Sequence, residues 1–299
     1  MNKIDQQRAR LGYLYVALAA ILFAISGTSA KFLFNDGITA FQLIQMRTTL
    51  AFTGLLIWLC LRYPTLLKIS IKYIPYFIGL GVFGIGSAQF FYLLAISKIN
   101  VAAAILLHYT GPVFVALYVV FVQRQKLSFN SVLAILGTLI GCFFVVGAYN
   151  LQLFALNREG IIAGIVAAVS FAVYSILSEY GMRRYTPWTV LLYGMLFAAL
   201  MWNSLHPPLE AFLHKYSLFQ WGLILFIGVC GTIFPFGLYF EGVKRIKPTH
   251  ASITATLEPI SAGVIAAVFL GEVLGSLQIV GGLIVIVSII ILQLNTAGN

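Results

Sequence analysis

Apolar runs of about twenty residues alternate with short polar connections along the whole chain. A helix needs about 20 mostly apolar residues to cross the hydrocarbon core of a bilayer. The connections are too short to hold a soluble domain. The pattern predicts an all-α polytopic membrane protein with ten transmembrane helices, at residues 11–31, 40–61, 74–95, 101–122, 129–149, 160–180, 188–204, 218–240, 249–270 and 277–294.

The first five predicted helices resemble the last five. Residues 81–146 align with the segment that begins at Gly228, without gaps over most of their length. An odd number of helices in each half reverses the direction in which the second half enters the membrane. We therefore predict two inverted five-helix repeats, residues 1–150 and 151–299. Such repeats place a substrate site near the bilayer midplane and allow alternating access by rocking.

Composition agrees with a protein embedded in a lipid bilayer, since 61% of the residues are hydrophobic and only 9% are charged. The net charge of +10 does not indicate nucleic-acid binding, because the basic residues form short clusters between the apolar runs. With ten helices, thirteen Lys and Arg residues fall on one side of the membrane and four on the other. The positive-inside rule then predicts two cytoplasmic termini.

The ninth predicted helix contains a carboxylate and a proline near its centre, Glu258 and Pro259. An ionised side chain inside a bilayer costs roughly 3 kcal/mol or more, so it usually faces a protein interior or a watery pathway. Pro259 has no N–H to give to the carbonyl of Ala255. We expect Glu258 to bind substrate or carry a coupling proton. The alternative is a packing carboxyl held by the hydroxyl of Thr254 or Thr256.

A matching interruption lies 147 residues upstream, where Gly111 and Pro112 occupy the place of Glu258 and Pro259. Here the carbonyl that loses its helical hydrogen bond, because Pro112 has no N–H, belongs to His108. Interrupted helices at corresponding positions of two halves indicate the binding site of a transporter. His108 is either a substrate donor or proton partner, or a core imidazole with its own hydrogen bonds.

Several motifs resemble those of the EamA-type members of the drug/metabolite transporter superfamily. They are a Gly-rich first helix in each half, Arg47 within LIQMRTTLAF, the segment ATLEPISAGVIAAVFLGE and the closing QIVGGLIVIVSIII. The resemblance covers nearly the whole chain. It implies ten helices around a central cavity, lined by the first, third, fourth, sixth, eighth and ninth, and metabolite movement without ATP. The two halves differ in sequence at the proline positions, where the first has His-Tyr-Thr-Gly-Pro and the second has Thr-Leu-Glu-Pro, so we expect an asymmetric site.

Polar and aromatic side chains complete the predicted substrate site. Gln89 and Tyr92 stand three residues apart, hence on one helix face, and Phe236 and Tyr239 repeat that spacing in the second half. Aromatic pairs suit an organic substrate with an apolar part, although ordinary helix packing explains the same pattern. The family resemblance adds two cavity residues, Ser26 from the first helix and Tyr174 from the sixth. The expected substrate-binding residues are Ser26, Gln89, Tyr92, His108, Tyr109, Tyr174, Phe236, Tyr239 and Glu258.

Three further charged features carry expectations of a different kind. Arg47 lies several residues inside the second helix, which the family places away from the cavity, so we expect helix anchoring or gating. Glu272 opens the turn before the tenth helix and is interpreted as a terminal or gate residue. Glu179 and Arg183, four residues apart, predict a structural ion pair on one helix.

No metal or cofactor is expected, because the other histidines, His206, His214 and His250, lie in or near loops without ligand spacing. The chain has no HExxH, GxSxG or phosphate-binding GxxxxGKS/T motif, which argues against an intramembrane enzyme and an ATP-driven pump. The predicted function is a secondary transporter that exports amino acids or related compounds across the cytoplasmic (inner) membrane of a bacterium.

Other functions stay open at this stage. Within the same class, the alternative is an uptake carrier or exchanger for a nucleoside-like cofactor or a quaternary amine, since an aromatic cavity with one carboxylate suits a cation. From other classes, the alternatives are a channel or an intramembrane enzyme. The expected partners are a small-molecule metabolite and the lipid bilayer, with the protein a monomer or a homodimer.

Overall fold

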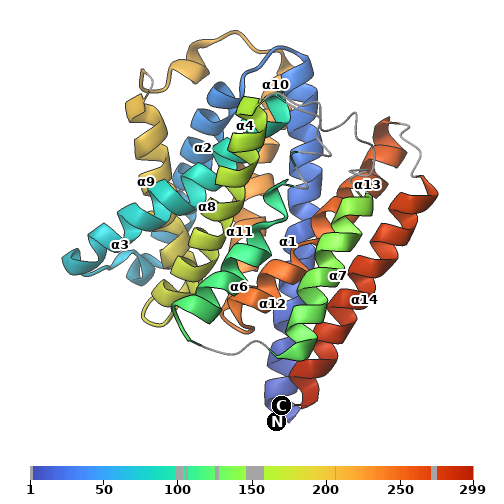
Figure 1. Ribbon diagram of the computed structural model, residues 1–299. Coiled ribbons are helices and arrows are strands. Elements are labelled where there is room, and N and C mark those ends of the chain that lie inside the picture. The colour runs from blue at the N-terminus through green and yellow to red at the C-terminus, as the bar shows by residue number, and fades with distance from the viewer. Residues whose placement is uncertain are drawn as a thin grey trace.

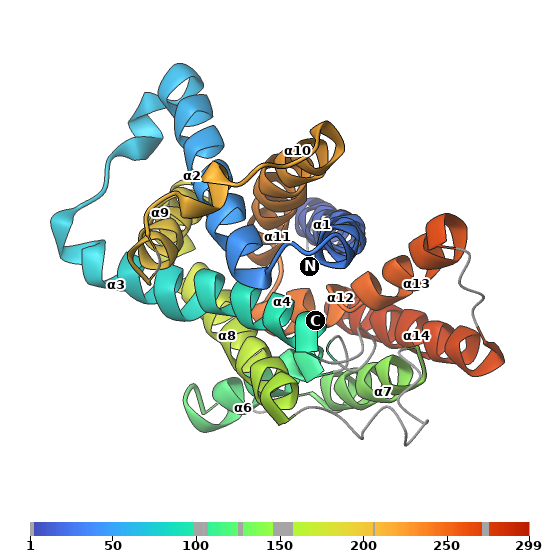
Figure 2. The same ribbon diagram turned by 90° about the horizontal axis from the view of Figure 1, so that it is seen from above.

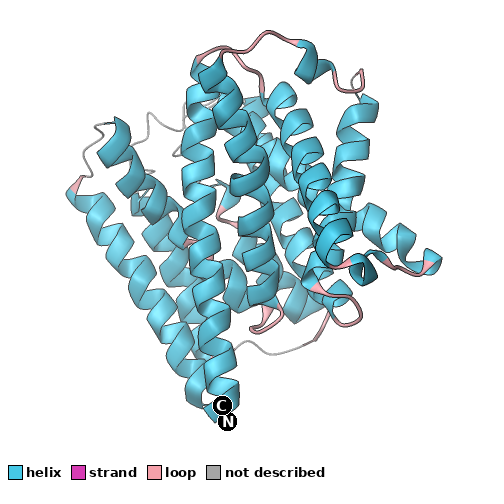
Figure 3. Ribbon diagram, turned by 180° about the vertical axis from the view of Figure 1, so that it is seen from behind, coloured by secondary structure: helices cyan, strands magenta, loops and turns pink. Residues whose placement is uncertain are grey.

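The computed structural model describes residues 3–98, 104, 107–124, 128–145, 158–205, 207–270 and 275–298. Within these ranges all regular structure is helical, and no strand occurs (Figure 3). Six helical segments are long and apolar enough to cross a membrane. They cover Gln6–Asn35, Ala40–Arg62, Ile71–Lys98, Arg158–Met182, Pro187–Leu205 and Leu218–Val243.

Four of the six segments are continuous α-helices, namely α1 (Lys3–Asn35), α2 (Ala40–Arg62), α8 (Arg158–Met182) and α9 (Pro187–Leu205). The other two have a π-helical middle. One comprises α3 (Ile74–Gly79), η3 (Leu80–Gly86) and α4 (Ser87–Lys98), preceded by the short turn η2 (Ile71–Tyr73). The other comprises α10 (Leu218–Leu225), η6 (Phe226–Ile233) and α11 (Phe234–Val243).

Six of the ten predicted spans are thus confirmed, and five further helices lie at the positions of the other four. These are α6 (Gly111–Phe121), α7 (Phe129–Val145), α12 (Pro248–Thr254), α13 (Leu257–Leu270) and α14 (Ser276–Gly298). Two 3-10 turns, η1 (Pro64–Leu67) and η5 (Glu210–Leu213), lie in connections.

The predicted interruption of the ninth span is confirmed between α12 and α13. The helix stops at Thr254, and a turn at Ala255 and Thr256 precedes the new helix. Because Pro259 has no N–H to donate, the Ala255 carbonyl accepts a hydrogen bond from the N–H of Glu258 instead, at 3.0 Å. A similar turn at residues 109–110 precedes α6. Proline therefore breaks the helix in both places and leaves a polar side chain beside the break.

Glycines in the two π-helical segments let neighbouring helices approach closely. A Cβ added to Gly84 of η3 would lie 2.9 Å from Cβ of Tyr174, and a Cβ added to Gly231 of η6 would lie 2.7 Å from Cβ of Ser26. Small residues permit such contacts between membrane helices. The same contacts fix where the Tyr174 and Ser26 side chains lie.

Each composite segment packs mainly against helices of the other half of the chain. The segment η3–α4 contacts α8 and α9, while η6–α11 contacts α1 and α2. The helices α7 and α14 run side by side along one flank, and the two ends of the chain lie at the same end of the molecule (Figures 1 and 2). The halves are therefore interlocked, and residues far apart in sequence meet between them.

A polar clamp joins α2 to the connection after α9. The Gln45 amide donates to Asn203 Oδ1 at 3.2 Å and to the carbonyl of Pro207 at 3.0 Å, and its oxygen accepts the N–H of Ala211 at 2.9 Å. The predicted ion pair of Glu179 and Arg183 is confirmed at 3.4 Å, with Glu179 in the last turn of α8 and Arg183 in the turn that follows this helix. Buried amides with all partners present stabilise one arrangement of helices.

Candidate functional site

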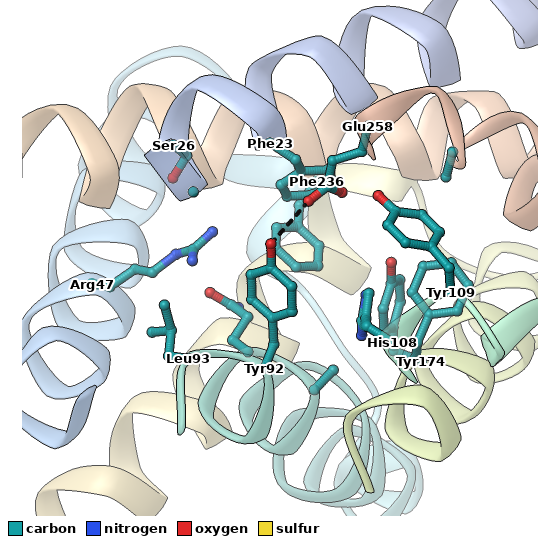
Figure 4. A pocket seen from close by; sticks show the side chains of 15 residues that line it. Phe23, Ser26, Arg47, Tyr92, Leu93, His108, Tyr109, Tyr174, Phe236 and Glu258 are labelled. Atoms are coloured by element: carbon teal, nitrogen blue, oxygen red, sulfur yellow. Dashed lines mark hydrogen bonds between the residues drawn. The ribbon is translucent and has the colours of Figure 1, made fainter. Parts of the chain in front are cut away.

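A cavity of about 60 Å³ lies between the two halves of the chain (Figure 4). Its walls come from α1, α2, α4, α8 and α11, from the turn before α6 and from the break between α12 and α13. A space of this size holds a few water molecules or a small solute. The lining residues are Phe23, Ser26, Gly27, Arg47, Ala88, Gln89, Tyr92, Leu93, His108, Tyr109, Phe171, Tyr174, Phe236, Ala255 and Glu258.

The structure brings eight of the nine predicted substrate-binding residues to this cavity. They are Ser26, Gln89, Tyr92, His108, Tyr109, Tyr174, Phe236 and Glu258. Residues predicted from the interrupted helices and residues predicted from the family's cavity thus lie around the same space. The two lines of sequence reasoning point to one site.

Tyr239 is the exception, and it lies behind the wall of the cavity. Its side chain is fully buried, its Oη lies 2.8 Å from Ser175 Oγ in a hydrogen bond, and its ring centre is 5.5 Å from that of Tyr174. A separation of three residues rotates a side chain by about 60° around a helix relative to its neighbour. Phe236 therefore reaches the cavity, whereas Tyr239 faces α8 and supports the wall.

Arg47 lines the cavity, which corrects the expectation that its helix lies away from it. The Arg47 residue is only 6% exposed. Its Nε donates to Thr232 Oγ1 at 2.7 Å and its Nη2 donates to the carbonyl of Gly231 at 3.1 Å. Helix η6 therefore holds Arg47 from one side, and the guanidinium points toward the cavity (Figure 4). A charge inside an apolar span was the signal that could have placed Arg47 in the site.

Glu258 lines the cavity from the first turn of α13, directly after the break. Its Oε1 accepts a hydrogen bond from the hydroxyl of Tyr92 at 3.4 Å. The hydroxyls of Thr254 and Thr256 donate instead to the carbonyls of His250 and Ile253. The alternative in which a neighbouring threonine holds the carboxyl is therefore not what the structure shows. The carboxylate is directed at the cavity and its tyrosines.

Several buried polar atoms around the cavity have no hydrogen-bond partner among the described residues. They are Ser26 Oγ, Gln89 Nε2 and Oε1, His108 Nδ1 and Tyr109 Oη. A buried polar atom left unpaired costs about 1–3 kcal/mol, so native proteins rarely tolerate such a group without a reason. Their convergence on one cavity indicates that a bound molecule or water supplies the missing partners.

Aromatic rings form the rest of the wall. The ring centres of Phe23 and Phe236 lie 5.0 Å apart, and those of Phe171 and Tyr174 lie 5.0 Å apart. The His108 ring lies 5.3 Å from the Phe171 ring. Phe23 and Phe171 were missed by sequence reasoning, although Phe23 stands three residues before Ser26 on the same helix.

Among the described residues, no group of three His, Cys, Asp or Glu side chains could hold a metal ion. His214 follows η5, and His250 lies within α12, where its Nδ1 is 3.0 Å from the hydroxyl oxygen of Tyr13. Glu272, interpreted above as a gate residue, lies outside the described residues.

Comparisons with known proteins agree with this architecture. An uncharacterized transporter of Archaeoglobus fulgidus is 30% identical over 284 residues, covering 94% of this chain and 96% of the relative. The uncharacterized inner membrane transporter YicL of Salmonella typhimurium is 25% identical over 299 residues, covering 96% of each chain. The threonine/homoserine exporter RhtA of Escherichia coli K12 is 26% identical over 199 residues, covering 65% of this chain and 63% of the relative.

A solved crystal structure has the same fold, with a TM-score of 0.75, 19% sequence identity and coverage of 96% of both chains. The EamA-like transporter family model matches the chain twice, at residues 10–147 and 158–294. The matching relatives are transporters and exporters rather than enzymes. With six apolar spans and a cavity between its halves, this chain belongs to the EamA-like transporter family and is a multi-pass membrane transporter.

Proposed function

We propose that the protein is a secondary transporter that exports small organic metabolites, amino acids or close relatives of them, across the bacterial inner membrane. One observation carries the proposal: a buried cation, a carboxylate and unpartnered polar atoms all face a single cavity between the halves of the chain. A soluble polar solute would complete those hydrogen bonds. The name of the relatives called threonine/homoserine exporters supports the amino-acid class.

Alternating access by two inverted repeats, residues 1–150 and 151–299, is the mechanism we propose. Reciprocal packing supports it, because Gly84 contacts Tyr174 and Gly231 contacts Ser26, and each member of the second pair lies about 147 positions from its counterpart in the first. Rocking of the halves would open the cavity to each side in turn. This movement needs no ATP.

Orientation and coupling complete the proposal. The basic clusters and the common location of both chain ends favour two cytoplasmic termini (Figure 1). Glu258 is proposed to release a proton when substrate is bound and to take one up when the cavity is empty. Export would then be driven by proton entry.

Counterflow in proteoliposomes tests the function. Vesicles loaded with an unlabelled amino acid should accumulate the same labelled amino acid transiently, because a carrier exchanges bound solutes one at a time. The screen covers the twenty standard amino acids, nucleoside-like compounds and quaternary amines. Accumulation of amino acids supports the proposal, whereas accumulation of only another class would replace it. Linear, non-saturable flux would indicate a channel.

A further inference from the structure

The cavity carries one permanent cation and one carboxylate, and they do not pair with each other. Arg47 and Glu258 both line it. Among the described residues, Arg47 donates to a hydroxyl and a carbonyl, Glu258 accepts from the hydroxyl of Tyr92, and no ion pair joins Arg47 to Glu258. Two opposite charges inside a membrane protein normally form an ion pair, because each unpaired charge is costly. Both charges therefore remain available to a ligand in the cavity that they line.

We propose that the cavity binds the zwitterion of an α-amino acid, with its carboxylate on Arg47 and its ammonium on Glu258. This inference rests on the proposed function and names the chemistry of its substrate. An α-amino acid carries its ammonium and its carboxylate on the same α-carbon, so a single small molecule can pair with both Arg47 and Glu258. A simple amine or a simple acid would leave one wall charge unpaired.

Arg47 has a fixed side chain with unused donors that can bind a carboxylate. Its Nε donates a hydrogen bond to Thr232 and its Nη2 donates one to Gly231, whereas Nη1 makes no hydrogen bond to the described residues. A guanidinium has five N–H donors in a planar fork that matches the two oxygens of a carboxylate. Because η6 already fixes the side chain, little ordering remains to be done when a carboxylate binds.

Glu258 and its neighbours suit an ammonium group. Its Oε1 has a hydrogen bond of 3.4 Å to Tyr92, and the Tyr109 hydroxyl, which lacks a partner, points to the same carboxylate (Figure 4). An ammonium has three donors to share among such oxygens. Gln89, with both amide atoms unpartnered, can bond either end of the ligand.

Tyr92 stands between the two charges. Its hydroxyl reaches Glu258, and a Cβ added to Gly27 would lie 3.5 Å from that hydroxyl, so α1 passes close behind it. Figure 4 shows Arg47 on one side of the ring and Tyr109 on the other. The side chain of the amino acid then has the aromatic wall of Phe23 and Phe236 to lie against.

Three ligands test the inference without any variant. Binding of L-threonine, of threonine amide, which lacks the carboxylate, and of 3-hydroxybutyrate, which lacks the ammonium, is measured on the purified full-length protein by calorimetry or thermal shift. We expect threonine to bind about 10- to 100-fold more tightly than either analogue, because each analogue loses a charged hydrogen bond. Equal binding of all three would overturn the inference.

Variants assign each charge to its residue. Arg47→Gln should lower the affinity for threonine to that for the amide and leave the amide nearly unchanged, and Glu258→Gln should lower it to that for 3-hydroxybutyrate. Thr232→Val is the matched control, since it removes the anchor of Arg47 but keeps the charge, and it should retain the preference for threonine. An unchanged preference in Arg47→Gln would overturn the assignment.

The two proposals fail in different ways. If amino acids show counterflow but the amide and the acid bind as tightly as threonine, the zwitterion site is wrong and amino-acid export stands. If no amino acid binds and another metabolite shows counterflow, both are wrong. The three-ligand comparison uses the wild-type protein, so a variant that fails to insert does not decide the outcome.

Discussion

At the scale of single residues, the site is built from groups that the fold leaves incomplete. Arg47 has no carboxylate partner, and Gln89 has no partner for either amide atom among the described residues. Natural proteins accept such costs where function requires them. The proposed role of these residues in recognition therefore comes with a local loss of stability.

A substitution of Gln89 tests whether this residue lowers stability and supports transport. Gln89→Leu should raise the free energy of unfolding by about 1–3 kcal/mol, because an unpaired buried amide is removed, and should reduce amino-acid counterflow. Gln45→Leu is the matched control, since the Gln45 amide makes three hydrogen bonds, and it should lower stability by a similar amount. Thermal denaturation in detergent measures both. A loss of stability in Gln89→Leu would contradict the assignment.

Glu258 makes a second residue-scale prediction. Glu258→Gln cannot exchange a proton, so its remaining transport should no longer respond to an imposed pH gradient, while insertion into the membrane is retained. Flux is measured in proteoliposomes with and without the gradient, at substrate concentrations that saturate the variant. A gradient effect equal to that of the wild type would remove Glu258 from proton coupling.

Tyr239 separates support of the wall from contact with substrate. Tyr239→Phe removes the hydrogen bond to Ser175 and should lower stability by about 1 kcal/mol, with substrate affinity nearly unchanged. Tyr92→Phe, which removes the hydroxyl beside Glu258, should weaken substrate binding. Affinity and melting temperature are measured for both variants. The opposite pattern would place Tyr239 in the site.

At the scale of elements, the interrupted and π-helical segments decide where side chains point. The break after Thr254 directs Glu258 inward, and the glycines of η3 and η6 allow α8 and α1 to approach. π-helical turns inside α-helices are frequently found at functional sites. These segments are the structural counterpart of the Gly- and Pro-rich positions in the two halves.

Gly84 tests this role of η3. Gly84→Val should displace Tyr174, because even a Cβ would lie 2.9 Å from Cβ of Tyr174, and should reduce transport at least 10-fold. Gly79→Val is the control on the same segment, since a Cβ there meets no atom within 4 Å. Counterflow and surface expression are compared. Full activity of Gly84→Val would show that this contact does not position the site.

At the scale of the whole molecule, the protein is an interlocked pair of halves in a lipid solvent. Large apolar side chains such as Leu136 and Leu283 are 51% and 57% exposed on α7 and α14, which lipid tolerates and water does not. The cavity is lined by residues of both halves, so the proposed movement of the halves would change access to it.

Orientation in the membrane is the prediction that belongs to this scale. In a cysteine-free background, Arg184→Cys should be protected from an impermeant thiol reagent in intact cells, and Lys215→Cys should react. Both positions are exposed, and the proposed topology places them on opposite sides of the membrane. Labelling of Arg184→Cys alone would reverse the topology.

The sequence by itself determined the membrane class, six of the spans and the helix break at Glu258. These features depend on local chemistry: an apolar run has no stable place in water, and a proline lacks an N–H. The resemblance to a known family and the spacing of polar residues also placed eight side chains at one cavity. Such features can be predicted from the sequence without knowing how the helices pack.

Only the tertiary structure decided how each helix is rotated. It turned Arg47 toward the cavity and Tyr239 away from it, and it showed that threonine hydroxyls do not hold Glu258. In a soluble protein the polar face of a helix marks the side that meets solvent. In lipid both the outer face and the packed face are apolar, so the pattern along a helix does not show which side chains meet the neighbouring half.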